Sequence, residues 1–369
     1  GLDGATHELI DQFIEEGKLP VFAVLKKEGA YGDLESTIPP TTPPAWASCI
    51  TGVNPGKHGI FDFRESPLQN PDQPLIHSKS IRSKRLWHIL NDNGLKTGIF
   101  NVPITYPPEA LDGFMISGMM TPSLHSPFTY PHTMKEEILS RFPDYEINVD
   151  IPQFETAYEE DANFFIEKVI HNFRIQAKTF TYLLNKTGYH FYMPVFVLPD
   201  RLSHLLWKYM DRRYLHSQTL MGQRIRNKVI TAFQEMDRFI GDIISQAPNR
   251  FLLLMVSDHG FGGTDGYFNV NRWLMDQGFL SLKLRKKIQK RLFFYSWKAS
   301  ELPLVKSIIP QNFARRIKKI IRNRRNSFQN ELLDSVQYLH SKAFFNSIPC
   351  QGIYANEELF SKRDMQSFL

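Results

Sequence analysis

The stretch STIPPTTPPAWASCITGVNPGKHGIFDF, residues 36–63, decides how the rest of the chain is interpreted. Prolines on both sides of Thr41 and Thr42 exclude a helix interior there and favour extended backbone. From Ala45 the pattern changes to that of a short helix, which Gly52 ends. Because the free N–H groups at a helix N-terminus attract anions, a threonine hydroxyl at this junction could meet a phosphate-like group. Taken alone, however, the two threonines could simply cap the helix.

The composition is that of an ordinary globular protein. A chain of 369 residues can bury one large core or two smaller ones, and 42% hydrophobic with 22% charged residues is typical of soluble domains. No apolar run approaches the roughly 20 residues of a membrane span. The two cysteines, Cys49 and Cys350, are too few for a disulfide framework and favour a reducing, cytoplasmic location. The chain begins at Gly1 without a methionine and stops at Leu369 within a pattern, so we expect it to be incomplete at both ends.

The net charge of +6 comes from a single segment. Residues 283–325 contain 15 Lys and Arg and one acid, whereas the remainder has 29 basic and 37 acidic residues. Apolar residues recur within this segment at helical spacing, so we expect a basic insertion at about 283–326 that forms two amphipathic helices. Such helices contact anionic membrane surfaces or polyanions. The alternative is an insertion that packs its apolar faces on the domain and leaves its charges in solvent.

Elsewhere, apolar strand patterns alternate with helical patterns. Strands are predicted at 1–4, 31–37, 97–102, 114–119, 191–198 and 250–256. Helices are predicted at 7–16, 21–27, 45–51, 83–93, 158–184 and 218–245. This alternation predicts an α/β fold with a mostly parallel sheet flanked by helices. Residues 64–80 and 122–154 show no clear period, and we expect them to be loop or cap excursions from a single catalytic domain that covers 1–369.

Polar side chains occupy the predicted ends of several strands. Asp3, Thr42, Asp200 and Asp258 each follow, or nearly follow, an apolar or extended stretch. Ligands of parallel sheets gather outside the carboxyl ends of the strands. These four side chains are therefore expected at one edge of the sheet.

Two histidines accompany these carboxylates. His204 stands four residues after Asp200, so a helix that begins at Asp200 would present both on one face. His259 directly follows Asp258 and precedes a glycine-rich turn. Taken alone, each aspartate–histidine pair is explained more simply by a carboxylate that caps a helix or by a hydrogen-bonded histidine in the core. Together with Asp3, they favour a metal site for zinc, or for manganese or iron, over one for calcium.

Four motifs then carry a resemblance to a known family. LDGAT at 2–6, the IPPTTPPAW and TGVNPGKHGI stretches within 38–60, PDRLSH at 199–204 and SDHG at 257–260 occur in that family's order. They resemble the type I phosphodiesterase/nucleotide pyrophosphatase family of the alkaline phosphatase superfamily, over residues 1 to about 280. The resemblance implies an alkaline-phosphatase-like core and a hydrolase of phosphodiester, pyrophosphate or other phosphate ester bonds.

The resemblance also implies roles for single residues. It assigns one cation to Asp3, Thr42, Asp258 and His259 and a second cation to Asp200 and His204. Thr42 would be the nucleophile, preferred over Thr41 on the family's register, and would form a phosphothreonine. Two divalent ions, by preference Zn²⁺, would stabilise the attacking and leaving oxygens of an in-line displacement. The substrate would be a phosphate ester, with nucleotides or lipid-linked esters as candidates, and no obligate protein partner is indicated.

The sequence also departs from the family pattern. No residue matches the family's last metal-binding histidine, which we expect beyond Leu369. Ala45 stands where the nucleotide pyrophosphatases have a phosphate-binding asparagine, so specificity for nucleotides stays open. An alternative is therefore a catalytically impaired relative that binds a polyanion or a membrane through residues 283–325.

Overall fold

The structure is a computed structural model that describes most of the chain. The described residues are 1–68, 72–151, 159–186, 188–248, 250–264, 266, 268–282, 336–346, 352–356 and 358–359. The predicted basic insertion at 283–326 lies outside them. The chain divides into two compact units, one of Gly1–Glu65 with Pro74–Asp265 and one of Ser66–Gln73 with Gly266–Leu369. The prediction of a single catalytic domain stays a prediction.

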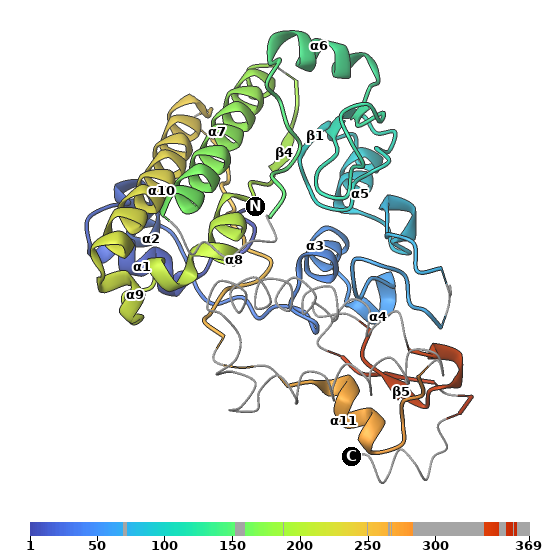
Figure 1. Ribbon diagram of the computed structural model, residues 1–369. Helices are drawn as coiled ribbons and strands as arrows, with labels where there is room; N and C mark the ends of the chain where they lie inside the picture. The colour runs from blue at the N-terminus through green and yellow to red at the C-terminus, as the bar shows by residue number, and fades with distance from the viewer. Residues whose placement is uncertain are drawn as a thin grey trace. The chain divides into compact units, whose positions relative to one another are not determined.

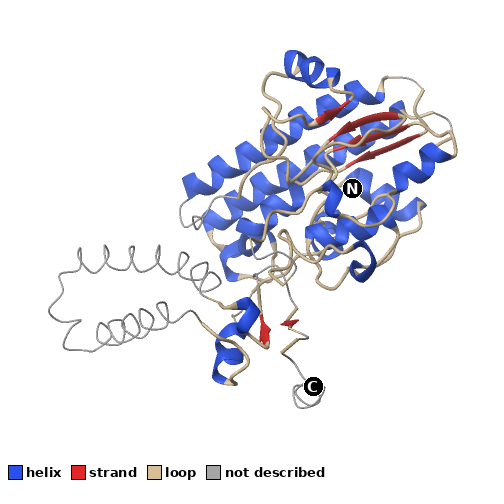
Figure 2. Cartoon of the chain, turned by 90° about the vertical axis from the view of Figure 1, so that its right-hand side faces the viewer, coloured by secondary structure: helices blue, strands red, loops and turns tan. Residues whose placement is uncertain are grey.

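The first unit is built on a four-stranded sheet, drawn in red in Figure 2, whose strand order is β3-β2-β1-β4. The strands are β1 (Thr97–Phe100), β2 (Gly113–Ile116), β3 (Thr129–Tyr130) and β4 (Phe191–Pro194). Strand β1 pairs in parallel with both β2 and β4, while β3 joins β2 in the antiparallel direction. The predicted α/β fold with a mostly parallel sheet is confirmed.

Beyond β4, short backbone pairings extend the sheet. The Phe196 N–H donates to the Gly1 carbonyl at 3.0 Å, and the Asp3 N–H donates to the Phe196 carbonyl at 3.0 Å. The Leu2 N–H donates to the Val256 carbonyl at 2.9 Å. Three chain segments that are distant in sequence therefore end side by side, and the candidate site begins where they end.

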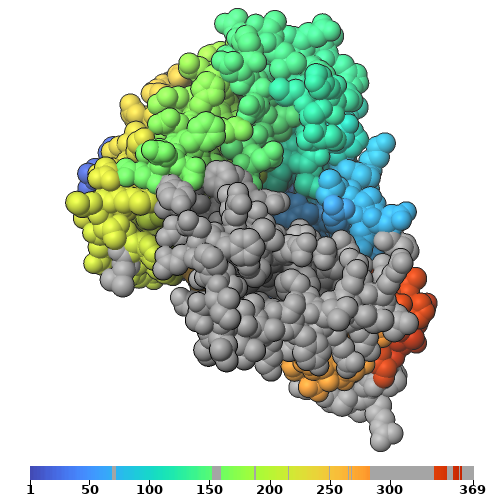
Figure 3. Space-filling model, in the orientation of Figure 1, coloured from blue at the N-terminus to red at the C-terminus, as the bar shows by residue number. Residues whose placement is uncertain are grey.

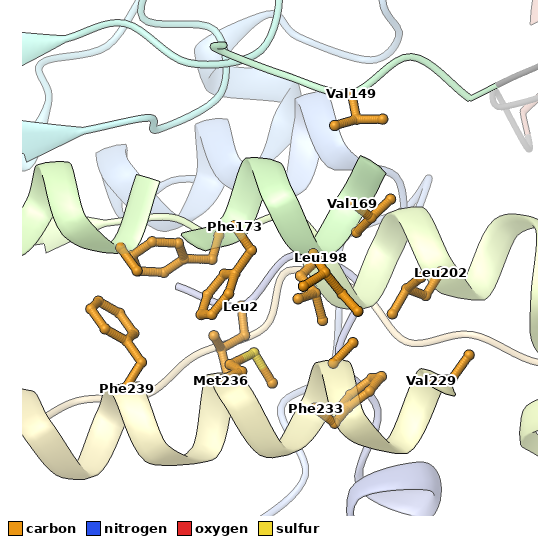
Figure 4. Packing of buried hydrophobic residues seen from close by; sticks show 14 of the residues in the cluster. Leu2, Val149, Val169, Phe173, Leu198, Leu202, Val229, Phe233, Met236 and Phe239 are labelled. Atoms are coloured by element: carbon orange, nitrogen blue, oxygen red, sulfur yellow. The ribbon is translucent and has the colours of Figure 1, made fainter. Parts of the chain in front are cut away.

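Helices cover both faces of the sheet, and the larger group lies on one of them (Figure 1). This group comprises α1 (His7–Glu15), α2 (Pro20–Glu28), α7 (Glu159–Leu184), α8 (Leu198–Met210), α9 (Leu215–Gln218) and α10 (Leu220–Gln246). In Figure 4, Phe173 of α7 and Leu198 of α8 lie close to Met236 and Phe239 of α10 in one buried cluster. The long predicted helices at 158–184 and 218–245 are confirmed, because their apolar stripes meet in this core.

The opposite face carries α3 (Thr42–Thr51), α4 (Pro55–His58) and α5 (Leu86–Asp92). Trp46 and Trp87 pack there with Ile99, Met115 and Val195 of the sheet. Neighbouring strand residues point to opposite faces, and all four residues of β1 are buried. The sheet is thus covered on both sides, as parallel sheets are.

Helix α3 begins earlier than predicted. Thr41 is extended, Pro43 and Pro44 lie in the first turn, and Gly52 ends the helix in a left-handed conformation with φ 67°. The sequence pattern predicts a helix from Ala45 with Pro44 in its first turn, whereas the helix already includes Thr42 and Pro43. Proline is tolerated in a first helical turn, where its missing N–H has no partner to lose.

Two predicted strands are wrong. Residues 251–256 form no strand in the described part of the chain, and Leu252 and Leu254 are 92% and 79% exposed. Residues 31–37 are likewise irregular, with Tyr31 exposed. An apolar run indicates burial only where the tertiary structure supplies a pairing partner, and the sequence does not contain that information.

The predicted excursions contain some regular structure. Residues 122–154 include β3 and α6 (Thr133–Arg141), which their lack of periodicity did not indicate. Helix α6 and the neighbouring α7 lie at the surface on the face shown in Figure 3. The described part of 64–80 is irregular, apart from a bridge between Arg64 and Leu75 and the 3-10 helix η1 (Ser78–Ser80).

The second unit has a small core of its own. It contains α11 (Val270–Asp276), the 3-10 helix η2 (Tyr338–His340), and a hairpin-like pair of β5 (Ala343–Phe344) and β6 (Tyr354–Ala355). Leu274, Leu280, Val336 and Phe344 form its buried cluster. Among the helices that the structure describes, none combines the length and hydropathy needed to span a membrane.

A carboxylate from α10 caps α2. Leu19, the N-cap residue of α2, has no side-chain group that could cap the helix. The N–H groups of Val21 and Phe22 in the first turn instead donate to Asp237 at 3.1 and 2.8 Å. Asp237 is buried; its hydrogen bond from Phe22 is buried as well, and that from Val21 is partly buried. This contact joins α2 to α10 within the core.

We expect Asp237→Ala to lower the free energy of unfolding by about 3 kcal/mol, since it removes two charge-assisted hydrogen bonds and leaves buried N–H groups unpaired. Urea unfolding measures the change. Asp242→Ala, at an exposed position of the same helix, is the matched control. Equal stability of the two variants would contradict the assignment.

Candidate active site

Thr42 lies at the start of α3, with its side chain buried. Its Oγ1 is 3.1 Å from Nε2 of His259. The preceding Thr41 Oγ1 is buried without a hydrogen-bond partner. The structure therefore brings the predicted nucleophile together with one of the predicted metal ligands.

The N-terminus of α3 offers few N–H donors, contrary to the sequence expectation. Pro43 and Pro44 have no N–H, and the Ala45 N–H donates to the Thr41 carbonyl at 3.1 Å. An anion beside Thr42 would thus find little hydrogen bonding from this turn. Positive charge has to come from another source.

Asp3 and Asp258 are buried carboxylates, each bonded through one oxygen only. Asp3 Oδ2 accepts from Trp46 Nε1 at 2.9 Å, and Asp258 Oδ1 accepts from the Gly4 N–H at 3.1 Å. The second oxygens, Asp3 Oδ1 and Asp258 Oδ2, have no hydrogen-bond partner. Burial of an unpaired carboxylate oxygen is unfavourable, so a ligand is expected there.

His259 faces both unpaired oxygens. Its Nε2 is 3.7 Å from Asp3 Oδ1 and 3.5 Å from Asp258 Oδ2. Its Nδ1 lies 3.1 Å from the Gly260 carbonyl, so we assign the N–H to Nδ1 and the lone pair to Nε2. One ligand atom from each of these three residues lies within 4.8 Å of the others. Two carboxylate oxygens and an imidazole nitrogen at this spacing fit a divalent cation.

Asp200 and His204 lie on one face of α8, as predicted. His204 Nε2 is 3.3 Å from Asp200 Oδ1, and Asp200 Oδ1 is 3.9 Å from His259 Nε2. Helix α8 begins at Leu198 and not at Asp200, which leaves the predicted spacing intact. This pair differs from the first group, because both Asp200 oxygens have partners and His204 is exposed.

Two neighbours of the site were missed from the sequence. The Arg201 guanidinium donates to Asp200 Oδ2 at 2.6 Å, and the Phe261 ring centroid lies 4.9 Å from that of His204 and 5.5 Å from that of His259. Arg201 belongs to the PDRLSH motif and Phe261 to the glycine-rich turn. The sequence indicated them only by their position next to a predicted ligand. Residue spacing does not show whether an arginine is buried or exposed to solvent.

The local environment shifts the pKa values of the three carboxyl groups in different directions. Burial, and then the charge of Asp258, raises the pKa of Asp3 well above its ordinary value. Burial also raises the pKa of Asp258 to about 7. Burial opposes ionisation of Asp200 too, but the hydrogen bond from His204 and the charge of Arg201 outweigh it and lower its pKa. Asp200 is the carboxylate that the protein itself keeps ionised.

Comparison with known proteins places the chain in a family. Residues 1–337 match the type I phosphodiesterase / nucleotide pyrophosphatase family. The chain belongs to this family. The resemblance of its motifs is confirmed, and the match extends beyond the 280 residues over which the motifs indicated it.

Solved structures add a more distant likeness, while a comparison with curated proteins gives no match. The chain is similar to phosphonoacetate hydrolase from Sinorhizobium meliloti 1021 in complex with phosphonoacetate, at 16% identity and a TM-score of 0.41. It is also similar to that hydrolase in complex with phosphonoformate, at 17% identity and a TM-score of 0.42. Each match covers 66% of this chain and 52% of the other, so the chain spans about half the length of these structures.

The raised pKa of Asp258 predicts how the stability of the metal-free protein changes with pH. At a pH between 3.8, the ordinary pKa of an aspartate, and about 7, the Asp258 carboxyl group is deprotonated in the unfolded chain but keeps its proton in the folded state. Stability from this group is complete below the lower value and decreases as the pH rises to the upper one.

Asp258→Asn should therefore be more stable than the unmodified protein at about pH 8, and this advantage should shrink at about pH 5. Urea unfolding in the presence of a chelator measures both. The same pH dependence in variant and unmodified protein would show that Asp258 titrates normally.

Proposed function

We propose that this protein is a divalent-metal-dependent phosphohydrolase that cleaves phosphodiester, pyrophosphate or other phosphate ester bonds through Thr42. One observation carries the proposal: the Thr42 hydroxyl lies 3.1 Å from His259 Nε2, next to the unpaired oxygens of Asp3 and Asp258. Membership of the type I phosphodiesterase / nucleotide pyrophosphatase family supports the same chemistry.

Asp3, Asp258 and His259 would hold one cation, with Thr42 beside it. Zn²⁺ is the preferred ion for this mixture of carboxylate and imidazole, with Mn²⁺ or iron as alternatives. A divalent cation there lowers the pKa of a nearby hydroxyl and neutralises charge on phosphoryl oxygens. The second cation predicted from the resemblance would be held by Asp200 and His204.

The residues of the chain prepare the nucleophile. The Nδ1–H of His259 donates to the Gly260 carbonyl, which leaves the Nε2 lone pair to bind the cation, 3.1 Å from Thr42 Oγ1. Burial of Thr42 keeps competing water away from the hydroxyl. Attack of Oγ1 on phosphorus, with loss of its proton to solvent, would form a phosphothreonine as the leaving oxygen departs with its bonding electrons. Attack of a water molecule, which also loses a proton, would then break the Oγ1–P bond and release the phosphate.

The start of α3 supports a dependence on metal. Pro43 and Pro44 have no N–H, and that of Ala45 is used within the helix. The backbone of this turn therefore offers fewer of the hydrogen bonds that stabilise a phosphoryl group in many other sites. A cation at Asp3, Asp258 and His259 would fill this need.

The unpaired oxygens also favour an enzyme over the binding-only alternative. A relative that had lost catalysis would have no reason to keep two buried carboxylate oxygens unpaired beside a threonine hydroxyl. Nucleotides and lipid-linked esters both remain candidate substrates. The membrane contact predicted for residues 283–325 rests on the sequence alone and stays a prediction.

We expect Thr42→Ala to abolish hydrolysis of bis-p-nitrophenyl phosphate while nearly all bound metal is retained, because the ligand carboxylates are unchanged. Steady-state kinetics and metal analysis of the same preparation test this. Thr41→Ala is the matched control and should remain active. The reverse pattern, with Thr41→Ala inactive, would move the nucleophile by one residue.

We expect Asp258→Asn and Asp200→Asn each to lose zinc, since an amide is a much weaker ligand than a carboxylate. Zinc retained after dialysis against a weak chelator is the measurement. The exposed Asp276→Asn serves as control. Unchanged retention in both site variants would refute the ligand assignment.

A further inference from the structure

Arg201 joins the candidate site to a distant part of the chain. Its Nη1 donates to Asp200 Oδ2 at 2.6 Å, while Nε and Nη2 both donate to Asn148 Oδ1 at 3.1 and 2.8 Å. The Arg201 side chain is only 7% exposed. A buried guanidinium bonded on two sides has a single orientation, because its planar fork fixes the direction of every N–H. Arg201 therefore fixes Asp200 relative to Asn148.

The backbone next to Asn148 is held by helix α7. Asn172 Nδ2 donates to the Glu146 carbonyl at 2.9 Å, and Gln176 Nε2 donates to the Ile147 carbonyl at 3.0 Å. Both amide side chains are buried on α7. Buried amides that bond to a loop backbone specify its position, since any displacement would leave them unpaired.

The same segment is anchored on both sides of Asn148. The buried Tyr145 hydroxyl donates to Asn101 Oδ1 at 2.8 Å, at the end of β1. Val149 belongs to the same buried cluster as Val169 of α7 (Figure 4). Residues 145–149 thus form a fixed support that reaches Asp200 through Asn148 and Arg201.

We propose that Arg201 and Asn148 are positioning residues, which hold the Asp200 carboxylate so that Oδ1 faces His204 and His259 while Oδ2 is kept by Arg201. The inference rests on the proposed function. Asp200 would then offer a single oxygen, next to His204 Nε2, to the second cation.

The physical reason is the crowding of carboxylates. Asp200 Oδ1 lies 3.9 Å from the same imidazole nitrogen that the unpaired oxygens of Asp3 and Asp258 face. Without a partner on Oδ2, the Asp200 carboxylate could rotate between several orientations. Partners outside the ligand shell remove this freedom, and their loss typically lowers metal affinity or activity about 10- to 100-fold.

Charge-conserving variants test the proposal in the full protein. Asn148→Ala leaves the charge of Arg201 in place, and Arg201→Lys keeps the charge but cannot bond both partners. Each should weaken the binding of one of the two Zn²⁺ ions about tenfold, measured by chelator competition, and should lower kcat for bis-p-nitrophenyl phosphate. Arg212→Lys, whose exposed guanidinium pairs with Glu15, is the matched control and should behave as the unmodified protein.

The double variant separates positioning from independent effects. Because Asn148 acts through Arg201, combining Asn148→Ala with Arg201→Lys should weaken Zn²⁺ binding no further than Arg201→Lys alone. Additive losses, or unchanged affinity in both single variants, overturn the proposal. Should Arg201→Lys fail to fold, the half-buried Asn148→Ala carries the test by itself.

The failure of this inference is distinguishable from failure of the proposed function. Unmodified protein that binds Zn²⁺ and hydrolyses the diester, with both variants equal to it, overturns the positioning role alone. A single Zn²⁺ equivalent that neither variant affects does the same. Unmodified protein that neither binds Zn²⁺ nor hydrolyses the diester overturns both.

Discussion

The candidate site depends on backbone hydrogen bonds that hold three chain segments side by side. Leu2 pairs with Val256, and Asp3 pairs with Phe196. Neighbouring strands lie about 4.8 Å apart, so acidic side chains that leave adjacent segments at the same edge are forced together. The meeting of Asp3 and Asp258 with His259 follows from these pairings.

The meeting of these segments brings several carboxyl groups together in the interior, and the protein does not provide hydrogen-bond partners for all of their oxygens. Trp46 and Gly4 each satisfy one oxygen of Asp3 or Asp258 and leave the other unpaired. Asp200, by contrast, has Arg201 on one oxygen and His204 next to the other. The two unpaired oxygens lie at the proposed cation site, and Asp200 shows how the chain itself can stabilise an ionised carboxylate.

The proposed nucleophile, Thr42, lies at the same edge of the sheet. Thr42 starts a helix whose first turn is rich in proline, so the backbone provides shape but few hydrogen-bond donors. The proposed chemistry would therefore depend on side chains and on a bound cation. The chain belongs to the type I phosphodiesterase / nucleotide pyrophosphatase family, and the local geometry fits the chemistry proposed above.

The sequence by itself determined the fold class and the positions of the six candidate residues. Long helical periods identified α7 and α10, because an apolar stripe has to be buried somewhere. The motifs placed acidic and imidazole groups at the ends of predicted strands, and the structure brings them together although residues 251–256 form no strand. Gly52 ended α3 as predicted, since a left-handed residue favours glycine.

Only the tertiary structure decided the rest. Residues 251–256 have the composition of a buried strand, yet strand formation depends on hydrogen-bond partners that other segments provide. Asn148 lies 53 residues before Arg201, and neither belongs to a pattern that indicates the contact. The ionisation of the three carboxyl groups also depends on burial and on neighbours brought in by folding. Local sequence specifies periodicity and motif order, whereas pairing, burial and charge compensation arise between residues that are distant along the chain.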